Sequence, residues 1–336
     1  MAYRVDTENH GGRTVIILRD ETSGASASIL PSFGFNMFDL RLPAAGQARR
    51  MVVAADDFAD TPTRPGRNGT PVLFPYPNRV RDGRFTFRGK EYHLPITNAP
   101  NAIHGFAISA AWDVVSQGVD DSGAFAVGRF HLAEHAPEMR PHWPTDAILE
   151  IRYSLAGRKL DMTVTVTNPT DAELPYGFGI HPYFRCPFAG APLSEARVIL
   201  PASRHWILEK NLPTGEIEPV SSRLDFRRGK SRAGLVLDDV LTGLTYQGDF
   251  GVARLIDNSL RSEFRLTFDR GFRELVAFTP PQDQTLLAIE PYTQTTDAIN
   301  LQARGLDAGL RVLGHGKSDT FRIGMETVDW DAPAKD

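Results

Sequence analysis

The sequence predicts an all-β protein whose strands are mostly antiparallel. Segments that alternate apolar with polar residues recur along the whole 336-residue chain. Turn-forming pairs rich in Gly, Pro, Asn and Asp separate these segments, and no stretch of twelve or more residues has a convincing helical period. The 29 glycines and 24 prolines are spread out rather than gathered into a linker. We therefore expect one domain over 1–336, with a frayed tail at about 330–336.

The clearest strand segment is KLDMTVTVTN (159–168). Every second residue from Leu160 to Val166 is apolar and the residues between them are Asp or Thr, which predicts a half-buried antiparallel strand. The run LLAI (286–289) is apolar throughout and is typical of a buried strand. The other predicted strands are RTVIIL (13–18), ASASIL (25–30), NMFDLRL (36–42), AFAVGRF (124–130), AILEIRYSL (147–155), ARVIL (196–200), FRLTF (264–268) and TFRIGMETV (320–328).

Turn chemistry marks the ends of these strands. We expect a hairpin built on Asp82-Gly83, because Asp and Gly accept the backbone angles that tight turns need. Further turn segments are RGKEY (88–92), NPTDAELP (168–175) and DRGF (269–272).

Composition excludes several classes of function. A net charge of −4 gives no basic surface for nucleic acid or anionic membranes, and no run reaches the roughly 18 apolar residues that span a bilayer. The single cysteine, Cys186, permits neither an intrachain disulfide nor a cysteine-rich metal site. The N-terminal stretch is acidic before it is apolar, unlike a signal peptide. We expect a cytoplasmic protein without a metal.

Two polar loops carry candidate ligand-binding residues. In FPYPNRVRDGRF (74–85), Asn78 and Arg79 follow a Pro-rich loop, and the Arg79 guanidinium is suited to bind a polar ligand. In NAPNAIHGF (98–106), His104 precedes a glycine, which lets its imidazole approach a ligand with little obstruction. The plain alternatives are an exposed arginine and a capping histidine.

Two further residues are candidates for acid–base chemistry. His181 lies in GFGIHPYFR (177–185) among aromatic residues, and Pro182 favours an extended backbone there. Partial desolvation makes such an imidazole tunable near neutral pH. Glu290 follows the apolar run 286–289, and we expect Glu290 and Pro291 to end that strand. The plain alternatives are a core histidine and a surface glutamate.

Together these segments resemble the aldose 1-epimerase (galactose mutarotase) family. The similar blocks are NRVRDGRFTFRGKEYHLPITNAPNAIHGF, GIHPYF, LDDVLTG and AIEPYTQTTDAIN, which occur in the expected order over roughly residues 70–300. The resemblance implies a large antiparallel β-sandwich of the galactose mutarotase type, with no metal or organic cofactor.

The resemblance also implies roles for individual residues. His181 matches the general acid and Glu290 the general base. His104 and Arg79 match residues that hold sugar hydroxyls and the ring oxygen. The substrate-binding aspartate falls at Asp238 or at its neighbour Asp239.

Asn78 is a further candidate for substrate binding beside Arg79. Two tryptophans, Trp143 and Trp206, either stack on a sugar face or fill the core, and the sequence leaves this choice open.

The implied reaction is interconversion of the α and β anomers of a free hexose similar to galactose or glucose. A base removes the proton of the anomeric hydroxyl while an acid protonates the ring oxygen, and the ring opens and recloses. We expect the acid limb of the pH profile to reflect protonation of Glu290 and the alkaline limb to reflect deprotonation of His181. The expected partner is a monosaccharide, bound by a monomer or a homodimer.

The sequence also leaves three different functions open. The first is an epimerase for an anionic sugar. The sequence departs from the family pattern next to His181, with Pro182 after it and Arg185 where many members have asparagine, and Arg81, Arg84 and Arg185 could bind a negatively charged group. The run IHGFAIS lacks the glutamine–histidine–glycine–phenylalanine–alanine–arginine motif of hexose-6-phosphate epimerases, so a free sugar is preferred. The second function is glycoside hydrolysis by Glu290 with an aspartate, and the third is that of a sensor that binds sugar without catalysis.

Overall fold

The computed structural model describes residues 2–330, and two β-sheets packed face to face make up most of it. The larger sheet has 13 strands. In sheet order it consists of β1 (Tyr3–His10), β2 (Arg13–Asp20), β3 (Ala25–Leu30), β4 (Asn36–Ala44), β5 (Gln47–Val52), β17 (Tyr183–Arg185), β26 (Leu286–Tyr292), β25 (Glu274–Phe278), β22 (Asp238–Leu244), β19 (Ala202–Glu209) and β20 (Leu212–Pro219), while β16 (Gly179–Ile180) pairs with β26 and with β6 (Val72–Leu73).

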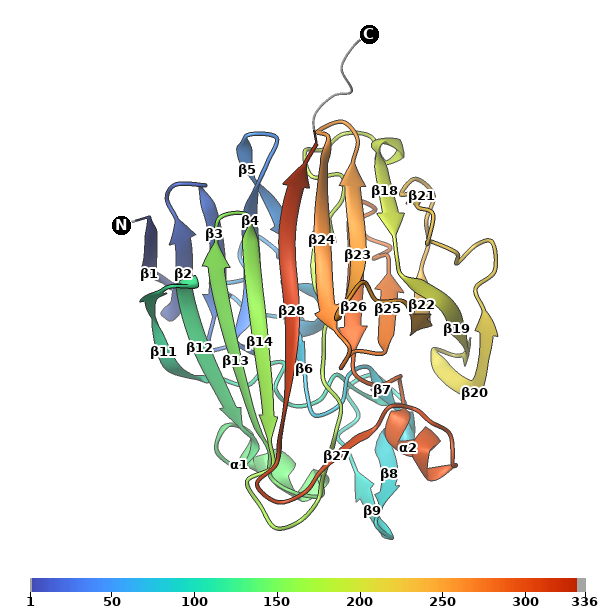
Figure 1. Cartoon of the computed structure of the whole chain (residues 1–336). Helices are drawn as coiled ribbons and strands as arrows, with labels where there is room; N and C mark the ends of the chain where they lie inside the picture. Colours follow the sequence, from blue (N-terminus) through green and yellow to red (C-terminus); the bar gives the residue numbers. More distant parts are fainter. Residues whose placement is uncertain (1, 331–336) are drawn as a thin grey trace.

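The smaller sheet has nine strands and is the near layer in Figure 1. Its order is β11 (Asp113–Asp120), β12 (Gly123–His131), β13 (Ile148–Ala156), β14 (Lys159–Thr167), β28 (Ser318–Asp329), β24 (Ser262–Asp269), β23 (Phe250–Asp257), β18 (Ala196–Ile199) and β21 (Lys230–Ser231). Strands β14 and β28 come from distant parts of the chain and lie side by side (Figure 1).

The main hydrophobic core lies between the two sheets. Phe184 of the larger sheet and Phe264 of the smaller one meet there with ring centroids 4.8 Å apart. On β14 the apolar residues from Leu160 to Val166 are buried while the residues between them are partly or fully exposed. The predicted alternation of this strand is therefore confirmed, as is the predicted antiparallel all-β class.

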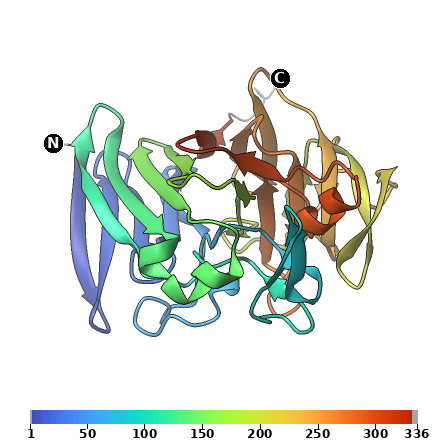
Figure 2. The same cartoon turned by 90° about the horizontal axis from the view of Figure 1, so that it is seen from below.

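Short elements gather at one end of the sandwich, at the bottom of Figure 1 and toward the viewer in Figure 2. They include the two-stranded ladders β7 (Arg79–Val80) with β10 (Ala102–Ile103), β8 (Arg84–Phe87) with β9 (Lys90–His93), and β15 (Leu174–Tyr176) with β27 (Arg311–Leu313). The helices of the described chain are α1 (Leu132–His135), α2 (Ala298–Ala303) and the 3₁₀ turns Pro65–Arg67, Arg81–Gly83, Pro137–His142 and Leu193–Glu195. None of the helices in residues 2–330 is long and apolar enough to cross a membrane.

The predicted hairpin on Asp82-Gly83 is wrong. Both residues have the positive φ of a turn, but this turn joins β7 to β8, and β7 pairs with β10 instead of β8. The hairpin of β8 and β9 turns at Arg88-Gly89, which also have positive φ. Turn chemistry alone does not say which two strands pair across it. The predicted frayed tail lies outside the described residues, apart from the exposed Trp330.

Candidate active site

Two short strands, β16 and β17, lie in line beside β26 and leave an interruption between them. Gly179 of β16 pairs with Tyr292, and Tyr183 of β17 pairs with Ala288. Three residues lie between the paired positions on each side, 180–182 and 289–291, so the register continues across the interruption. Residues directly opposite one another on neighbouring antiparallel strands share a face of the sheet.

His181 and Glu290 are opposite each other in this register, at the interruption itself. Pro182 fills the break on one side. On the β26 side, Pro291 has no N–H with which to bond to the opposite strand. The N–H at this position would point toward β16 and β17, because the N–H of Thr293, two residues on, points that way and bonds to the carbonyl of Phe178, the residue before β16. The prediction that Pro291 ends the strand is therefore wrong, since β26 continues to Tyr292.

The two side chains meet. His181 Nε2 lies 3.2 Å from Glu290 Oε1. His181 is 6% exposed and Glu290 only 1%, and loop residues pack nearby, with Gly66 against Tyr183 and His104 against His181. The imidazole stacks on Tyr183, with ring centroids 4.8 Å apart, and meets the ring of Phe278 edge-on. Two titratable side chains are thus held in contact, with strands on one side and aromatic rings on the other.

His104 is held against this pair by a tight loop. Its ring meets that of His181 edge-on, with centroids 5.7 Å apart. The backbone N–H of Asn78 points at the ring nitrogen Nδ1 of His104 (3.3 Å), and the backbone N–H of His104 donates to the backbone carbonyl of Asn78 (3.0 Å). Gly105 permits this arrangement because its φ is positive and an added Cβ would lie 2.2 Å from the Phe74 carbonyl oxygen. If Nδ1 accepts the Asn78 bond, Nε2–H of His104 remains free to donate to a ligand.

Arg79 is fixed by two asparagines. Its Nη1 donates to Asn78 Oδ1 at 2.9 Å, and its Nε donates to Asn98 Oδ1 at 3.2 Å. Asn78 Oδ1 also accepts the backbone N–H of Arg79, so the Asn78 side chain holds the Arg79 guanidinium in place. The positive charge of Arg79 reaches the site, where it favours ionisation of Glu290.

The register also separates the two adjacent aspartates. Asp238 lies opposite Phe278, which lies opposite Ala288, so Asp238 shares the face of Glu290, two residues beyond Ala288. Asp239 faces the other way and makes a two-point ion pair with Arg223. The structure thus brings Asp238, and not Asp239, to the site.

Burial controls the proton affinities of the central pair. Removal from water raises the pKa of Glu290 well above its ordinary value. The Tyr292 hydroxyl and Arg79 oppose this shift, while the charge of Asp238 adds to it. Burial likewise lowers the pKa of His181 to about 3. Each residue therefore favours its uncharged form, and the pair holds one proton over a wide range of pH.

These directions favour the opposite assignment of the two pH limbs from the one expected from sequence. Gain of a second proton creates a buried cation on His181 and is pushed to low pH. Loss of the only proton creates a buried anion on Glu290 and is pushed to high pH. Arg79 does lower the pKa of Glu290, but desolvation of the carboxyl is the larger effect.

The same environment affects His104. Although this residue is partly exposed, removal of its ring from bulk water is the largest cause that lowers its pKa well below the ordinary value. The nearby His181 and Arg79 act in the same direction. A neutral His104 suits the role of hydrogen-bond donor to a neutral ligand.

Both tryptophans left open by the sequence are buried. Trp143 stacks on Tyr76 and donates its N–H to the Pro175 carbonyl (3.0 Å), so it fills the core. Trp206 donates its N–H to the buried carboxyl of Glu274 (3.2 Å). With exposures of 2% each, neither presents a face for stacking on a sugar.

Sequence reasoning missed Tyr292, whose hydroxyl donates to Glu290 Oε2. The signal was present, because residues two apart on a strand share a face. It also missed Asn98, although that residue lies in a loop already singled out for His104. A hollow of about 760 Å³ adjoins the site, and His104 and Asn98 form part of its wall.

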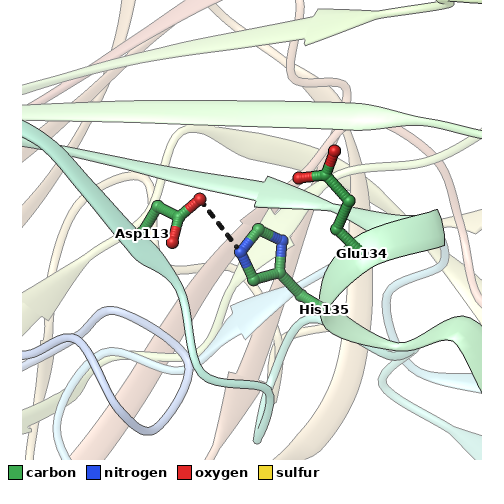
Figure 3. Close-up of side chains that lie close together, drawn as sticks. All are labelled: Asp113, Glu134 and His135. Carbon is green, nitrogen blue, oxygen red and sulfur yellow. Dashed lines mark ion pairs between the residues drawn. The ribbon is translucent and has the colours of Figure 1, made fainter.

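One group of side chains outside the site could offer ligand atoms to a metal ion (Figure 3). The donor atoms of Asp113, Glu134 and His135 lie within 4.8 Å of one another. Asp113 contacts His135 at 3.3 Å, while Glu134 contacts His131 at 3.0 Å. Because both carboxylates are exposed and already have histidine partners, these are surface contacts, of which the first joins β11 to α1 and the second joins α1 to the end of β12.

Comparison with known proteins gives a consistent result. Residues 15–326 match the family described as Aldose 1-epimerase. A galactose mutarotase of Rattus norvegicus is 30% identical over 159 residues, which are 45% of this chain and 43% of that protein. An uncharacterized protein of Escherichia coli K12, YphB, is 31% identical over 160 residues, 46% of this chain and 49% of that protein. The chain thus spans about half the length of the curated relatives it matches.

The fold is matched over a greater length. The crystal structure of a galactose mutarotase-like protein from Clostridium acetobutylicum superimposes with a TM-score of 0.89, at 24% identity, over 98% of this chain and 99% of that one. This similarity identifies the fold as galactose mutarotase-like. Because the family match extends over 15–326, the chain belongs to the aldose 1-epimerase family.

Proposed function

We propose that this protein is an aldose 1-epimerase that interconverts the α and β anomers of a free hexose similar to galactose or glucose. The observation that carries the proposal is the 3.2 Å contact between His181 Nε2 and Glu290 Oε1 at the interruption beside β26. Ring opening needs one group that gives a proton and another that takes one, both within reach of a single pyranose.

The chemistry follows from the single proton of the pair. Glu290 as carboxylate takes the proton of the anomeric hydroxyl, and His181 as imidazolium protonates the ring oxygen. The bond between carbon 1 and the ring oxygen breaks and gives an open-chain aldehyde. Rotation about the bond between carbons 1 and 2 presents the other face of the carbonyl, and reclosure reverses both proton transfers. The direct contact of the two groups lets the proton move from Oε1 to Nε2 to form the ionised pair.

The remaining residues are assigned to binding. Arg79 and Asp238 lie close enough to Glu290 for their charges to shift its pKa, and His104 lies close enough to His181 and Arg79 for its own pKa to be lowered by them. Arg79 and His104 are assigned to sugar hydroxyls and the ring oxygen, and Asp238 to a hydroxyl. Asn78 holds Arg79 and His104 in place. A monosaccharide partner is in keeping with the family, and a cytoplasmic location is part of the proposal.

An anionic sugar is a weaker candidate. Of the three arginines that favoured it, Arg81 lies beside the carboxyl of Asp297, with its Nε 3.6 Å from Oδ2 and its backbone N–H bonded to Oδ1. Hydrolysis by paired carboxylates would leave the contact between His181 and Glu290 without a role. A sensor that only binds sugar has no need of a buried acid–base pair.

Polarimetry on freshly dissolved α-glucose and α-galactose tests the proposal. We expect mutarotation to be accelerated in proportion to enzyme concentration, with no release of a glycosidic product from matched glycosides. Saturable binding without acceleration across a panel of free, phosphorylated and sulfonated sugars would refute the proposal in favour of a sensor. Acceleration confined to the charged sugars would move the substrate class to anionic sugars.

A further inference from the structure

Tyr292 is a buried residue that contacts the proposed base directly. It lies two residues after Glu290 on β26, is fully buried, and donates its hydroxyl to Glu290 Oε2. His181 Nε2 faces the other oxygen, Oε1. The two oxygens of one carboxyl therefore have different partners.

The sheet makes room for this contact. Gly179 lies opposite Tyr292, and an added Cβ at Gly179 would lie 2.3 Å from Cδ1 of the tyrosine ring. The ring thus lies over the glycine, which positions the phenol toward Glu290. A side chain at residue 179 would push the ring, and with it the hydroxyl, away from this position.

We propose that Tyr292 is a positioning residue for Glu290, which it holds by Oε2 so that Oε1 is the oxygen that exchanges protons with His181 and with the sugar. The inference rests on the proposed function. A bond from a neutral donor to a carboxylate favours the ionised carboxyl. Tyr292 thereby has two effects, which are to fix the orientation of the base and to stabilise the ionised form of the pair.

Other groups also face Glu290. His181 approaches from the interruption between β16 and β17, Asp238 from β22, and Arg79 from β7. Tyr183 of β17 also lies near enough for the charge of Glu290 to affect it. Any test of Tyr292 must leave these four groups unchanged, which favours the smallest substitution, removal of one oxygen in Tyr292→Phe.

The chain supplies a matched control. Tyr176 also donates its hydroxyl to a carboxylate, that of Asp319, and is fully buried, but it belongs to β15 and pairs with β27. Tyr176→Phe removes the same atom from the same kind of contact outside the site. A general loss of packing or stability would affect both variants, whereas a positioning role affects only Tyr292→Phe.

The experiment measures turnover by polarimetry and the titration of Glu290 by ¹³C NMR of carboxyl-labelled glutamate, with the Glu290 signal assigned by its loss in Glu290→Gln. For Tyr292→Phe we expect kcat to fall about tenfold or more, with KM little changed. We expect the titration midpoint of Glu290 and the alkaline limb of activity both to move to higher pH, because the anion has lost a donor. Tyr176→Phe should change neither quantity.

A double-mutant cycle separates action through Glu290 from any independent action. In a Glu290→Gln background, Tyr292→Phe should cause no further loss of residual activity. A full additional loss in that background, or an unchanged midpoint and an unchanged kcat in the single variant, would overturn the inference.

The NMR arm keeps this inference distinct from the proposed function. If no sugar is turned over, the proposed function fails, but the titration of Glu290 can still be measured. A midpoint that moves to higher pH in Tyr292→Phe then supports the effect of the contact on the carboxyl, and an unmoved midpoint overturns it. If Tyr292→Phe does not fold, 3-fluorotyrosine incorporated at position 292 replaces it. A more acidic phenol is a stronger donor, so the midpoint should move to lower pH, and an unmoved midpoint overturns the inference.

Discussion

Glu290 and Glu274 lie on the same face of neighbouring strands, β26 and β25, in the larger sheet. Val276 lies opposite Glu290, and Glu274 is two residues before Val276 on the same face. Both carboxyls are almost completely buried, at 1% and 0% exposure. Burial raises the pKa of Glu274 to about 8 and raises that of Glu290 well above its ordinary value.

Their neighbours differ. Glu290 faces the imidazole of His181 and lies near enough to Arg79 for the arginine charge to affect the pKa of the carboxyl. Glu274 accepts the Trp206 N–H, and its other oxygen lies 3.5 Å from Arg273 Nε without a hydrogen bond. Glu290 thus has a partner, His181, that can exchange a proton with it. The neighbours of Glu274, the Trp206 indole and the Arg273 guanidinium, stay protonated at all ordinary pH.

The comparison teaches that a shifted pKa does not by itself mark a base. Desolvation affects both glutamates in the same direction, yet acid–base catalysis also needs a second titrating group within hydrogen-bond distance. That group is present beside Glu290 because the interruption between β16 and β17 places His181 there. Glu274 pairs with Tyr292 of β26, and the ladder of β25 with β22 runs without a break from Phe278 to Leu275, next to Glu274.

The largest expected effect is a difference in activity between variants of the two glutamates. Glu290→Gln keeps the shape and the Tyr292 contact but cannot accept a proton, so kcat should fall about 100-fold or more with little change in KM. Glu274→Gln, the matched control, should stay within about twofold of the parent protein. Polarimetry on fresh α-anomers measures both. Comparable activity in the two variants would remove Glu290 from the mechanism.

The pH profile sharpens the same comparison. Because burial raises the pKa of Glu290, the loss of the pair's single proton lies on the alkaline side, and that limb should disappear from the residual activity of Glu290→Gln. Because burial lowers the pKa of His181 to about 3, the acid limb should lie well below the ordinary range of histidine and should persist in that variant. Loss of the acid limb instead would restore the assignment made from sequence alone.

Much of the fold could be predicted because its strands alternate. The residues of β14 show this most clearly, since one face lies in the core. The edge strand β11 (Asp113–Asp120) escaped prediction because it is exposed along almost its whole length, so neither face selects apolar residues. Apolar and polar residues alternate where one face of a strand is buried, and a strand with both faces exposed has no such pattern.

The site was harder to predict than its residues. The residue types of His181 and Glu290 were visible, but β16 and β17 have two and three residues, too few to show a period. Their alignment with β26 depends on pairing between distant parts of the chain. The direction of the pKa shifts was not predicted for a related reason: the charged residue types can be read from a sequence, whereas the burial that raises the pKa of Glu290 depends on the folded chain.

A second, smaller effect concerns the arginine near each glutamate. Arg79→Ala should raise KM about tenfold or more while kcat changes less, because Arg79 is assigned to hold the sugar in ground and transition states alike. Arg273→Ala, the control, removes a guanidinium that contacts Glu274 and pairs with Asp307, and it should leave KM unchanged. A collapse of kcat at constant KM in Arg79→Ala would place that residue in the chemical step.

The smallest effect is on stability, and it tests the burial that the two glutamates share. Glu274 has an ordinary pKa of 4.5 when unfolded and a pKa of about 8 in the folded protein, so the folded state holds a proton that the unfolded state releases between these values. The stability that protonated Glu274 contributes should therefore be fully present below pH 4.5 and should be lost as pH rises toward 8. Gln cannot ionise and does not share this loss, although its carbonyl can still accept the Trp206 N–H.

The Tm of Glu274→Gln should consequently gain on that of the parent protein as pH rises, by at least about 2 °C at pH 8 relative to pH 5. Glu173→Gln is the control, because Glu173 is exposed and its pKa is lowered by Arg88, so its Tm difference should be the same at pH 5 and pH 8. Thermal melts followed by circular dichroism measure these differences. A Tm difference for Glu274→Gln that is constant over this range would mean that Glu274 is already ionised in the folded protein, with Arg273 as a full ion-pair partner, and the likeness between the two buried carboxyls would not hold.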